Sequence, residues 1–168
     1  EILNADFIIC CCDPEIVFEK MLSNIKMPKR LQLMYENKNS YPVISSFHIA
    51  FKVTSDVKIP ETFVFEMIKP IQIGATVYNR LMIRSYDYGN FTPENSSYVL
   101  QVFLLQREKD YDYWATLSKE EYAQNKKQIC KHITNEIVLK FKELQNNIEY
   151  LDCWTPLTYT KYFDAHKG

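Results

Sequence analysis

The strictest constraint on the fold is a period-two alternation of apolar and polar residues in Ile44–Val53. Its apolar positions are Phe47, Ile49, Phe51 and Val53, and its other positions are Ser46, His48, Ala50 and Lys52. This period is typical of a β-strand with one face turned inward. Further strand patterns cover residues 62–68, Thr76–Tyr86, 97–106 and Ile148–Trp154. Residues 98–105 are apolar apart from Gln101, which favours a central place in the sheet.

One long amphipathic helix follows the main run of strands. Ser118 and Glu121 form a Ser-x-x-Glu capping box, which is a signature of a helix start. The apolar residues beyond it are Tyr122, Ile129, Ile133, Ile137, Phe141 and Leu144. Their spacing predicts a helix of about 25 residues that lays an apolar stripe on the sheet. The predicted fold is α+β: a mixed, largely antiparallel sheet of about five or six strands, covered by helices, in one domain over residues 1–168.

The first forty residues predict one strand and two short helices. Residues 5–12 are mostly apolar and predict a short buried strand. Asp13 and Pro14 follow as an N-cap and a first helical residue, so we expect a helix over residues 14–22. A second helix is expected over residues 28–38, with Pro28 at its start.

Charge and cysteine content indicate which kinds of partner the chain binds and in which cellular compartment it folds. The 20 basic and 21 acidic residues are interspersed, so we do not expect a nucleic-acid partner. No segment approaches the ~20 apolar residues of a transmembrane helix. The five cysteines include three adjacent ones, which favours a reducing cytoplasm over a disulfide framework. The chain lacks an initiator Met and ends abruptly at Gly168, which favours an interior piece of a longer polypeptide.

Glycine content limits how the chain can bind a nucleotide. Phosphate-binding loops need several closely spaced glycines, and the chain has three: Gly74, Gly89 and Gly168. Neither the dinucleotide fingerprint nor the P-loop can be written with them. We therefore expect no nucleotide cofactor bound by either loop.

Several residues are candidates for chemistry or for plain packing. For Cys10, Cys11 and Cys12 we favour burial over metal binding or catalysis, because adjacent residues on a strand cannot easily share one zinc ion. We expect His48 and His132 to be structural or solvated, and we predict no metal site. Residues 107–114 predict either a binding loop or the approach to a helix. Residues 154–159 predict either a rigid loop that lines a pocket or a simple exit from the last strand.

The order of several motifs resembles the phytoene desaturase-like family of FAD-dependent oxidoreductases, within the amine-oxidase-type flavoenzymes. Residues 5–9 (Ala-Asp-Phe-Ile-Ile) with Asp13-Pro14 are similar to a family strand that leaves the flavin domain. Residues 85–94 resemble a family loop that ends in Ala-Pro-Glu-Gly-Lys, with Asn95-Ser96 in place of Gly-Lys. Tyr113-Trp114, Tyr122 and Lys126 match the opening of the family's long helix.

The last motif of this resemblance lies near the C-terminus. Asp152 and residues 155–159 (Thr-Pro-Leu-Thr-Tyr) with Tyr162 and Lys167-Gly168 are similar to the family's Thr-Pro-x-Thr…Tyr segment. Two features depart from the family: Cys10–Cys12 replace small polar residues, and the glycine-rich flavin segments are absent. The resemblance implies a substrate-binding domain that covers a flavin and encloses a hydrophobic, isoprenoid-like substrate. It places Trp154, Thr155, Pro156, Tyr159 and Tyr162 near the flavin or the substrate.

The resemblance also implies where the cofactor is held. FAD would be bound by a Rossmann-type domain elsewhere in the polypeptide, and this chain alone would carry no cofactor and no complete catalytic site. Two other hypotheses stay open. One is a self-contained binding module with an aromatic-rich apolar groove, and the other is a cysteine-based enzyme that uses Cys10–Cys12.

Overall fold

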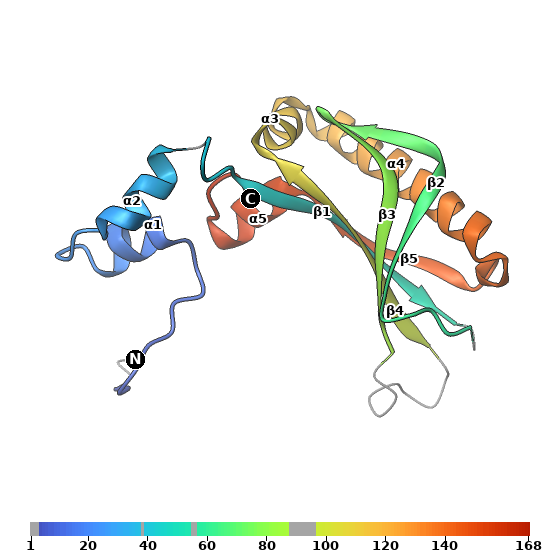
Figure 1. Cartoon of the computed structure of the whole chain (residues 1–168), viewed down its shortest axis with the longest axis horizontal. Coiled ribbons are helices and arrows are strands. Elements are labelled where there is room, and N and C mark those ends of the chain that lie inside the picture. Colours follow the sequence, from blue (N-terminus) through green and yellow to red (C-terminus); the bar gives the residue numbers. More distant parts are fainter. Residues whose placement is uncertain (1–3, 38, 55–56, 88–96) are drawn as a thin grey trace.

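Five strands form one antiparallel sheet in the order β2-β3-β4-β1-β5 (Figure 1). The computed structural model describes residues 4–37, 39–54, 57–87 and 97–168. The strands are β1 (Ile44–Val53), β2 (Thr62–Ile73), β3 (Thr76–Tyr86), β4 (Tyr98–Arg107) and β5 (Ile148–Trp154). The predicted α+β class and its largely antiparallel sheet are confirmed, and β4 takes the predicted central position. The part of the predicted family loop at residues 88–94, with Asn95-Ser96, lies outside the described residues.

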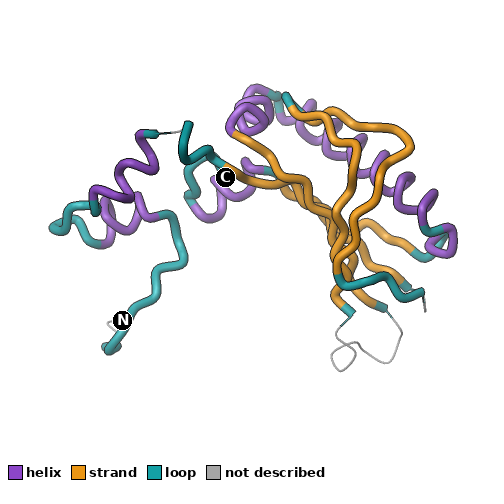
Figure 2. The backbone as a smooth tube through the Cα atoms, in the orientation of Figure 1, coloured by secondary structure: helices purple, strands orange, loops and turns teal. Residues whose placement is uncertain are grey.

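The helices precede, follow and separate these strands. They are α1 (Pro14–Ile16), the π-helix η1 (Val17–Met21), α2 (Lys29–Glu36), α3 (Glu108–Thr116), α4 (Lys119–Lys140), the 3-10 helix η2 (Lys142–Leu144) and α5 (Pro156–Phe163). In Figure 2, α4 runs along one side of the sheet. None of the helices in the described part of the chain has the length and apolar character that crossing a bilayer requires.

Helix α4 covers one face of the sheet, as its apolar spacing predicts. The Ser118 hydroxyl accepts a hydrogen bond from the Glu121 N–H (3.2 Å), and the Glu121 carboxylate accepts one from the Ser118 N–H (2.9 Å), so the capping box is confirmed. The buried stripe consists of Ile129, Ile133 and Ile137. It packs into a core that contains the inward residues of β1, namely Phe47, Ile49, Phe51 and Val53. The helix has 22 residues and ends at Lys140, so it is slightly shorter than predicted.

Strand β2 is longer than predicted because it continues past a bulge. The strand pattern stops at residue 68, and the pairing with β3 shifts register between Glu66 and Ile71. Pro70 lies within this irregular stretch, where a residue without an N–H is tolerated on an edge strand. The Glu136 carboxylate, buried on α4, accepts the N–H groups of Ile68 (2.6 Å) and Lys69 (3.2 Å). One side chain of α4 therefore satisfies two backbone donors at the bulge.

A second buried carboxylate fixes the turn between β2 and β3. Asp110, on α3, accepts hydrogen bonds from the Ala75 N–H (2.9 Å), the Thr76 hydroxyl (2.8 Å) and the Arg107 N–H (2.9 Å). Gly74 lies in this turn with φ of +62°, and a Cβ there would lie 2.9 Å from an oxygen of Asp110. The close approach and the left-handed backbone both require glycine at this position.

The N-terminal segment differs from its prediction. Residues 4–12 form no strand, and Phe7, Ile8 and Ile9 are 90%, 83% and 87% exposed. The predicted buried strand at residues 5–12 is therefore wrong for this chain, because no described strand pairs with it. The expected helix starts are correct: the Asp13 carboxylate accepts the Glu15 N–H (2.9 Å), and Pro28 caps α2.

Asp13 also joins the N-terminal helices to the C-terminal segment, beside which they lie in Figure 1. Its carboxylate accepts hydrogen bonds from the Tyr35 hydroxyl and from the His166 N–H (3.1 Å). Lys20 forms an ion pair with Asp164 (2.9 Å). Although burial opposes the change, the hydrogen bonds from Tyr35, Glu15 and His166 lower the pKa of Asp13. The attachment depends on a charged Asp13.

Replacing Glu136 with Gln tests the link between α4 and the bulge. We expect Glu136→Gln to lower the free energy of unfolding by about 2 kcal/mol, because the amide replaces one of the two acceptor oxygens with an NH2 group that faces an N–H donor. Urea unfolding followed by circular dichroism measures this change. The control Glu143→Gln, at an exposed site, should stay within about 0.5 kcal/mol of the parent chain. Equal stability of the two variants would contradict the assignment.

Candidate functional site

The segment after β5 is a helix and not the loop that residues 154–159 suggested. Thr155 is the N-cap of α5, Pro156 is its first residue, and the Thr155 N–H donates to the Thr158 hydroxyl (3.1 Å). Ser, Thr, Asp or Asn followed by Pro is a helix-start signal, and the prediction of a loop at residues 154–159 is wrong because Thr155-Pro156 begins a helix. The helix holds its aromatic side chains at fixed positions beside the end of β5.

The five residues selected from the resemblance occupy different environments. Thr155 and Pro156 are buried, and the Thr155 hydroxyl lies 3.0 Å from the Tyr122 hydroxyl of α4. Trp154 donates its indole N–H to the Tyr159 hydroxyl (2.6 Å). Tyr162 is 71% exposed. The structure thus joins Trp154 to Tyr159 by a hydrogen bond. Thr155 and Pro156 are buried beneath them, where β5 passes into α5.

Trp154 belongs to a row of side chains that crosses the whole sheet. Strand pairing places Val64 opposite Met82, Met82 opposite Phe103, Phe103 opposite His48, and His48 opposite Trp154. We call these five residues, one from each strand, the cross-strand row. They alternate with the core residues, so they lie on the face of the sheet turned away from α4. All five are half-buried or exposed, with Val64 51% exposed.

His48 lies within the cross-strand row between two aromatic rings. Its ring is stacked on Phe103 (centroids 5.7 Å apart) and on Trp154 (5.1 Å). The Ser46 hydroxyl lies 2.7 Å from its Nε2, and the Gln101 amide lies 3.1 Å from its Nδ1. Burial lowers the pKa of His48, so its ring is neutral at neutral pH. His48 therefore acts here as an uncharged, hydrogen-bonded aromatic residue.

The stretch at residues 107–114 is the start of α3 and not a binding loop. Its Trp114 is fully buried, stacks on Phe47 (5.7 Å) and donates its indole N–H to Gln106 (2.8 Å). Tyr113 donates to Asn125 of α4 (2.9 Å). These contacts agree with the second alternative, in which the aromatic residues cover the edge of the core. The Asp110 contacts described above hold this helix to the sheet.

Two cysteines that the sequence pattern did not connect meet beneath α4. Cys130 on α4 and Cys153 on β5 are both buried, their thiols are hydrogen-bonded, and the Tyr150 hydroxyl donates to the Cys153 sulfur (3.3 Å). The hydrogen bond from Cys130 lowers the pKa of Cys153 to about 7. Burial opposes this shift, and the hydrogen bond from Tyr150 adds to it. The same pairing, together with burial, raises the pKa of Cys130. Sequence spacing gives no signal for this pair, because 22 intervening residues separate two different elements.

The adjacent cysteines behave differently from the packing prediction. Cys10 and Cys11 are exposed and Cys12 is half-buried, so their predicted burial is wrong. His132 lies on α4 with its Nε2 2.8 Å from the Lys69 carbonyl oxygen, where it supports the bulge of β2. Within the described ranges, no cluster of three or more His, Cys, Asp or Glu side chains is arranged to hold a metal ion.

Comparison with known proteins adds no relative to this picture. No family model, curated protein or solved structure matches the chain. The features that point to a function are the cross-strand row and the exposed N-terminal segment.

The Cys130–Cys153 pair predicts a specific pattern of thiol reactivity. We expect the pH midpoint for alkylation of Cys153 by iodoacetamide to lie below that of an ordinary thiol, because the hydrogen bonds from Cys130 and Tyr150 lower its pKa. Tyr150→Phe should raise it, and alkylation at pH 7 should become about tenfold slower, because the thiolate loses a hydrogen bond. Mass spectrometry of the Cys153 peptide across pH measures the rate. Tyr41→Phe, at an exposed site, is the control. An unchanged midpoint in Tyr150→Phe would contradict this account.

Proposed function

We propose that this chain is the substrate-binding domain of an FAD-dependent oxidoreductase similar to the phytoene dehydrogenases, acting on a hydrophobic substrate. The observation that carries the proposal is the cross-strand row. A sheet face turned away from its covering helix normally carries polar side chains. Here the row itself (Val64, Met82, Phe103, His48, Trp154) carries no formal charge at neutral pH, and the Glu66–Arg80 ion pair lies beside it on the same face. Such a surface suits contact with an apolar ligand or with another apolar surface.

The exposed N-terminal segment supports a longer polypeptide around this domain. Phe7, Ile8 and Ile9 are consecutive, strand-favouring and almost fully exposed. Such a run gains stability when it pairs with a sheet edge and buries its apolar side chains. The resemblance assigns residues 5–9 to a strand that leaves the flavin domain. We propose that the flavin domain of the same polypeptide supplies the missing neighbours.

The described residues of this chain suit contact with the flavin ring of FAD but not with its pyrophosphate. Gly74 is committed to the turn held by Asp110, so the described backbone forms no glycine-rich cradle for a pyrophosphate. The row residues Phe103, His48 and Trp154 present aromatic surface suited to the edge of a planar ring system. When bound, FAD would supply the electron-pair transfer from substrate. This chain's own residues would exclude water and position the apolar substrate.

The neutral state of His48 fits this role. A charged imidazolium in an apolar cavity would be poorly solvated, and burial keeps the ring uncharged at neutral pH. Its two nitrogens lie near Ser46 and Gln101, so the ring is held in place by hydrogen bonds on both sides. We assign His48 a positioning role in the wall and not a proton-transfer role.

The proposal predicts that a polypeptide longer than this chain is yellow because it carries bound flavin. The chain with its natural flanking sequence should purify with flavin, detected by the visible absorption band. Val64→Lys should weaken flavin retention at least about tenfold, because an unpaired ammonium at a newly buried contact costs more than 1.4 kcal/mol. Leu139→Lys is the matched control, since Leu139 is 53% exposed on α4 and Val64 is 51% exposed. A longer polypeptide that is colourless after gentle purification would overturn the proposal.

A further inference from the structure

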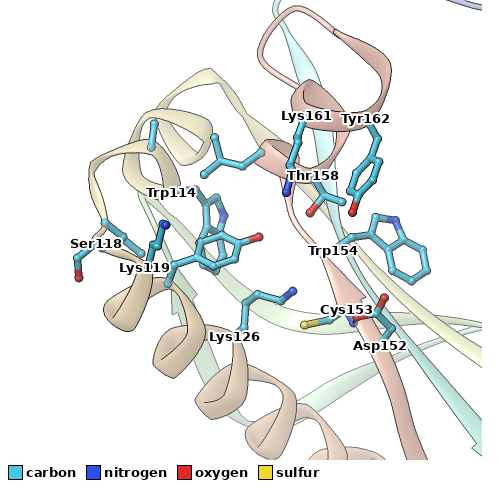
Figure 3. A pocket seen from close by; sticks show the side chains of 14 residues that line it. Trp114, Ser118, Lys119, Lys126, Asp152, Cys153, Trp154, Thr158, Lys161 and Tyr162 are labelled. Atoms are coloured by element: carbon cyan, nitrogen blue, oxygen red, sulfur yellow. Dashed lines mark hydrogen bonds between the residues drawn. The ribbon is translucent and has the colours of Figure 1, made fainter.

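A cavity of about 510 Å³ lies between α4 and α5 beside the end of β5, and Trp154 of the cross-strand row is among its lining residues (Figure 3). Its walls come from the end of α3, the first half of α4, the end of β5 and the first turns of α5. The volume is in the range of small-molecule sites. The Asp110 contacts of α3 and the Tyr122–Thr155 hydrogen bond fix the elements that form it.

Three lysines and a single carboxylate line this cavity. Lys119 and Lys126 come from α4, Lys161 comes from α5, and the acidic residue is Asp152. None of the three lysines forms an ion pair with another described residue. Asp152 accepts the N–H of Cys153 (2.7 Å) with one of its oxygens. The chain as a whole has 20 basic and 21 acidic residues, so the excess of positive charge is local.

Much of the remaining wall is aromatic or apolar, although Ser118 and Thr158 also line it. Trp114 is fully buried, and its ring meets that of Tyr122 edge-on (centroids 5.6 Å apart). Leu117 and Leu157 add aliphatic surface. The Lys126 ammonium lies 5.4 Å from the centroid of the Tyr122 ring, and the Lys161 ammonium lies 5.6 Å from that of Tyr162. In Figure 3, Lys126 points from α4 toward Cys153 and Asp152.

We propose that this cavity binds a small organic anion. Its carboxylate, sulfonate or phosphate group would lie among Lys119, Lys126 and Lys161, and its apolar body would pack on the partly exposed Leu117, Tyr122 and Leu157. A neutral apolar molecule would leave the converging ammonium groups without a counter-charge. A bare inorganic anion would leave the aromatic wall in contact with water. A molecule with both parts satisfies both surfaces. This site shares Trp154 with the proposed flavin contact, but its three lysines lie outside the cross-strand row.

Two fluorescent probes test the proposal directly. Anilinonaphthalene sulfonate is an aromatic anion, and N-phenylnaphthylamine has the same aromatic body without the sulfonate. The two tryptophans of the chain, Trp114 and Trp154, both line the cavity, so energy transfer from tryptophan reports a dye bound near this end of the sheet. Because Trp154 also belongs to the cross-strand row, the lysine variants distinguish the cavity from the row. We expect the sulfonate to bind at least about tenfold more tightly than the neutral probe, with the difference decreasing at high salt.

Single lysine variants separate this cavity from other surfaces. Lys126→Met and Lys161→Met should each weaken sulfonate binding about three- to tenfold and leave binding of the neutral probe unchanged. Lys52→Met, at an exposed site on β1, is the control and should change neither. Circular dichroism checks that each variant is folded. Equal affinity for the two probes, equal losses in Lys52→Met, or binding without energy transfer would overturn the proposal.

Discussion

The packing of α4 against a single face of the sheet determines the rest of the structure. Its stripe of Ile129, Ile133 and Ile137 makes that face the core, and Glu136 fastens it to the bulge of β2. The opposite face, with the cross-strand row, remains available for contact. The first half of α4 meanwhile forms one wall of the lysine-lined cavity. Both surfaces that we connect to function are therefore consequences of where this helix lies.

Two buried carboxylates accept hydrogen bonds from backbone N–H groups that have no partner in the strand ladder. Glu136 accepts two N–H groups at the bulge, and Asp110 accepts three donors around the β2–β3 turn and the start of α3. Buried donors without acceptors are costly, so each carboxylate is needed where the regular ladder is interrupted. Glu136 holds α4 to the interior of β2, and Asp110 holds α3 to the turn at the C-terminal end of that strand. The position of Trp114 in the cavity wall depends on the Asp110 anchor, because both residues lie on α3.

The sequence predicted elements whose signals are local. The alternation in β1 and β3 and the pattern in β5 identified those strands with correct bounds, and the capping box located the start of α4. The prediction of a strand at residues 5–12 failed because strand propensity alone does not supply a neighbouring strand to pair with. Helices α3 and α5 were missed because their Tyr- and Thr-rich sequences have weak helix propensity, although Thr155-Pro156 carried a start signal. The cross-strand row and the Cys130–Cys153 pair depend on register between distant segments, which one sequence does not reveal.

The most direct test of the account compares surface labelling in two forms of the protein. A diazirine probe labels exposed side chains, and mass spectrometry can compare the isolated chain with the polypeptide that includes its natural flanking sequence. We expect the peptides that contain residues 5–12, Val64 and Phe103 to be labelled much less in the longer form. Labelling of Leu139 on the outer side of α4 should not change. Equal labelling of the cross-strand row in both forms would contradict the claim that this face covers a partner domain.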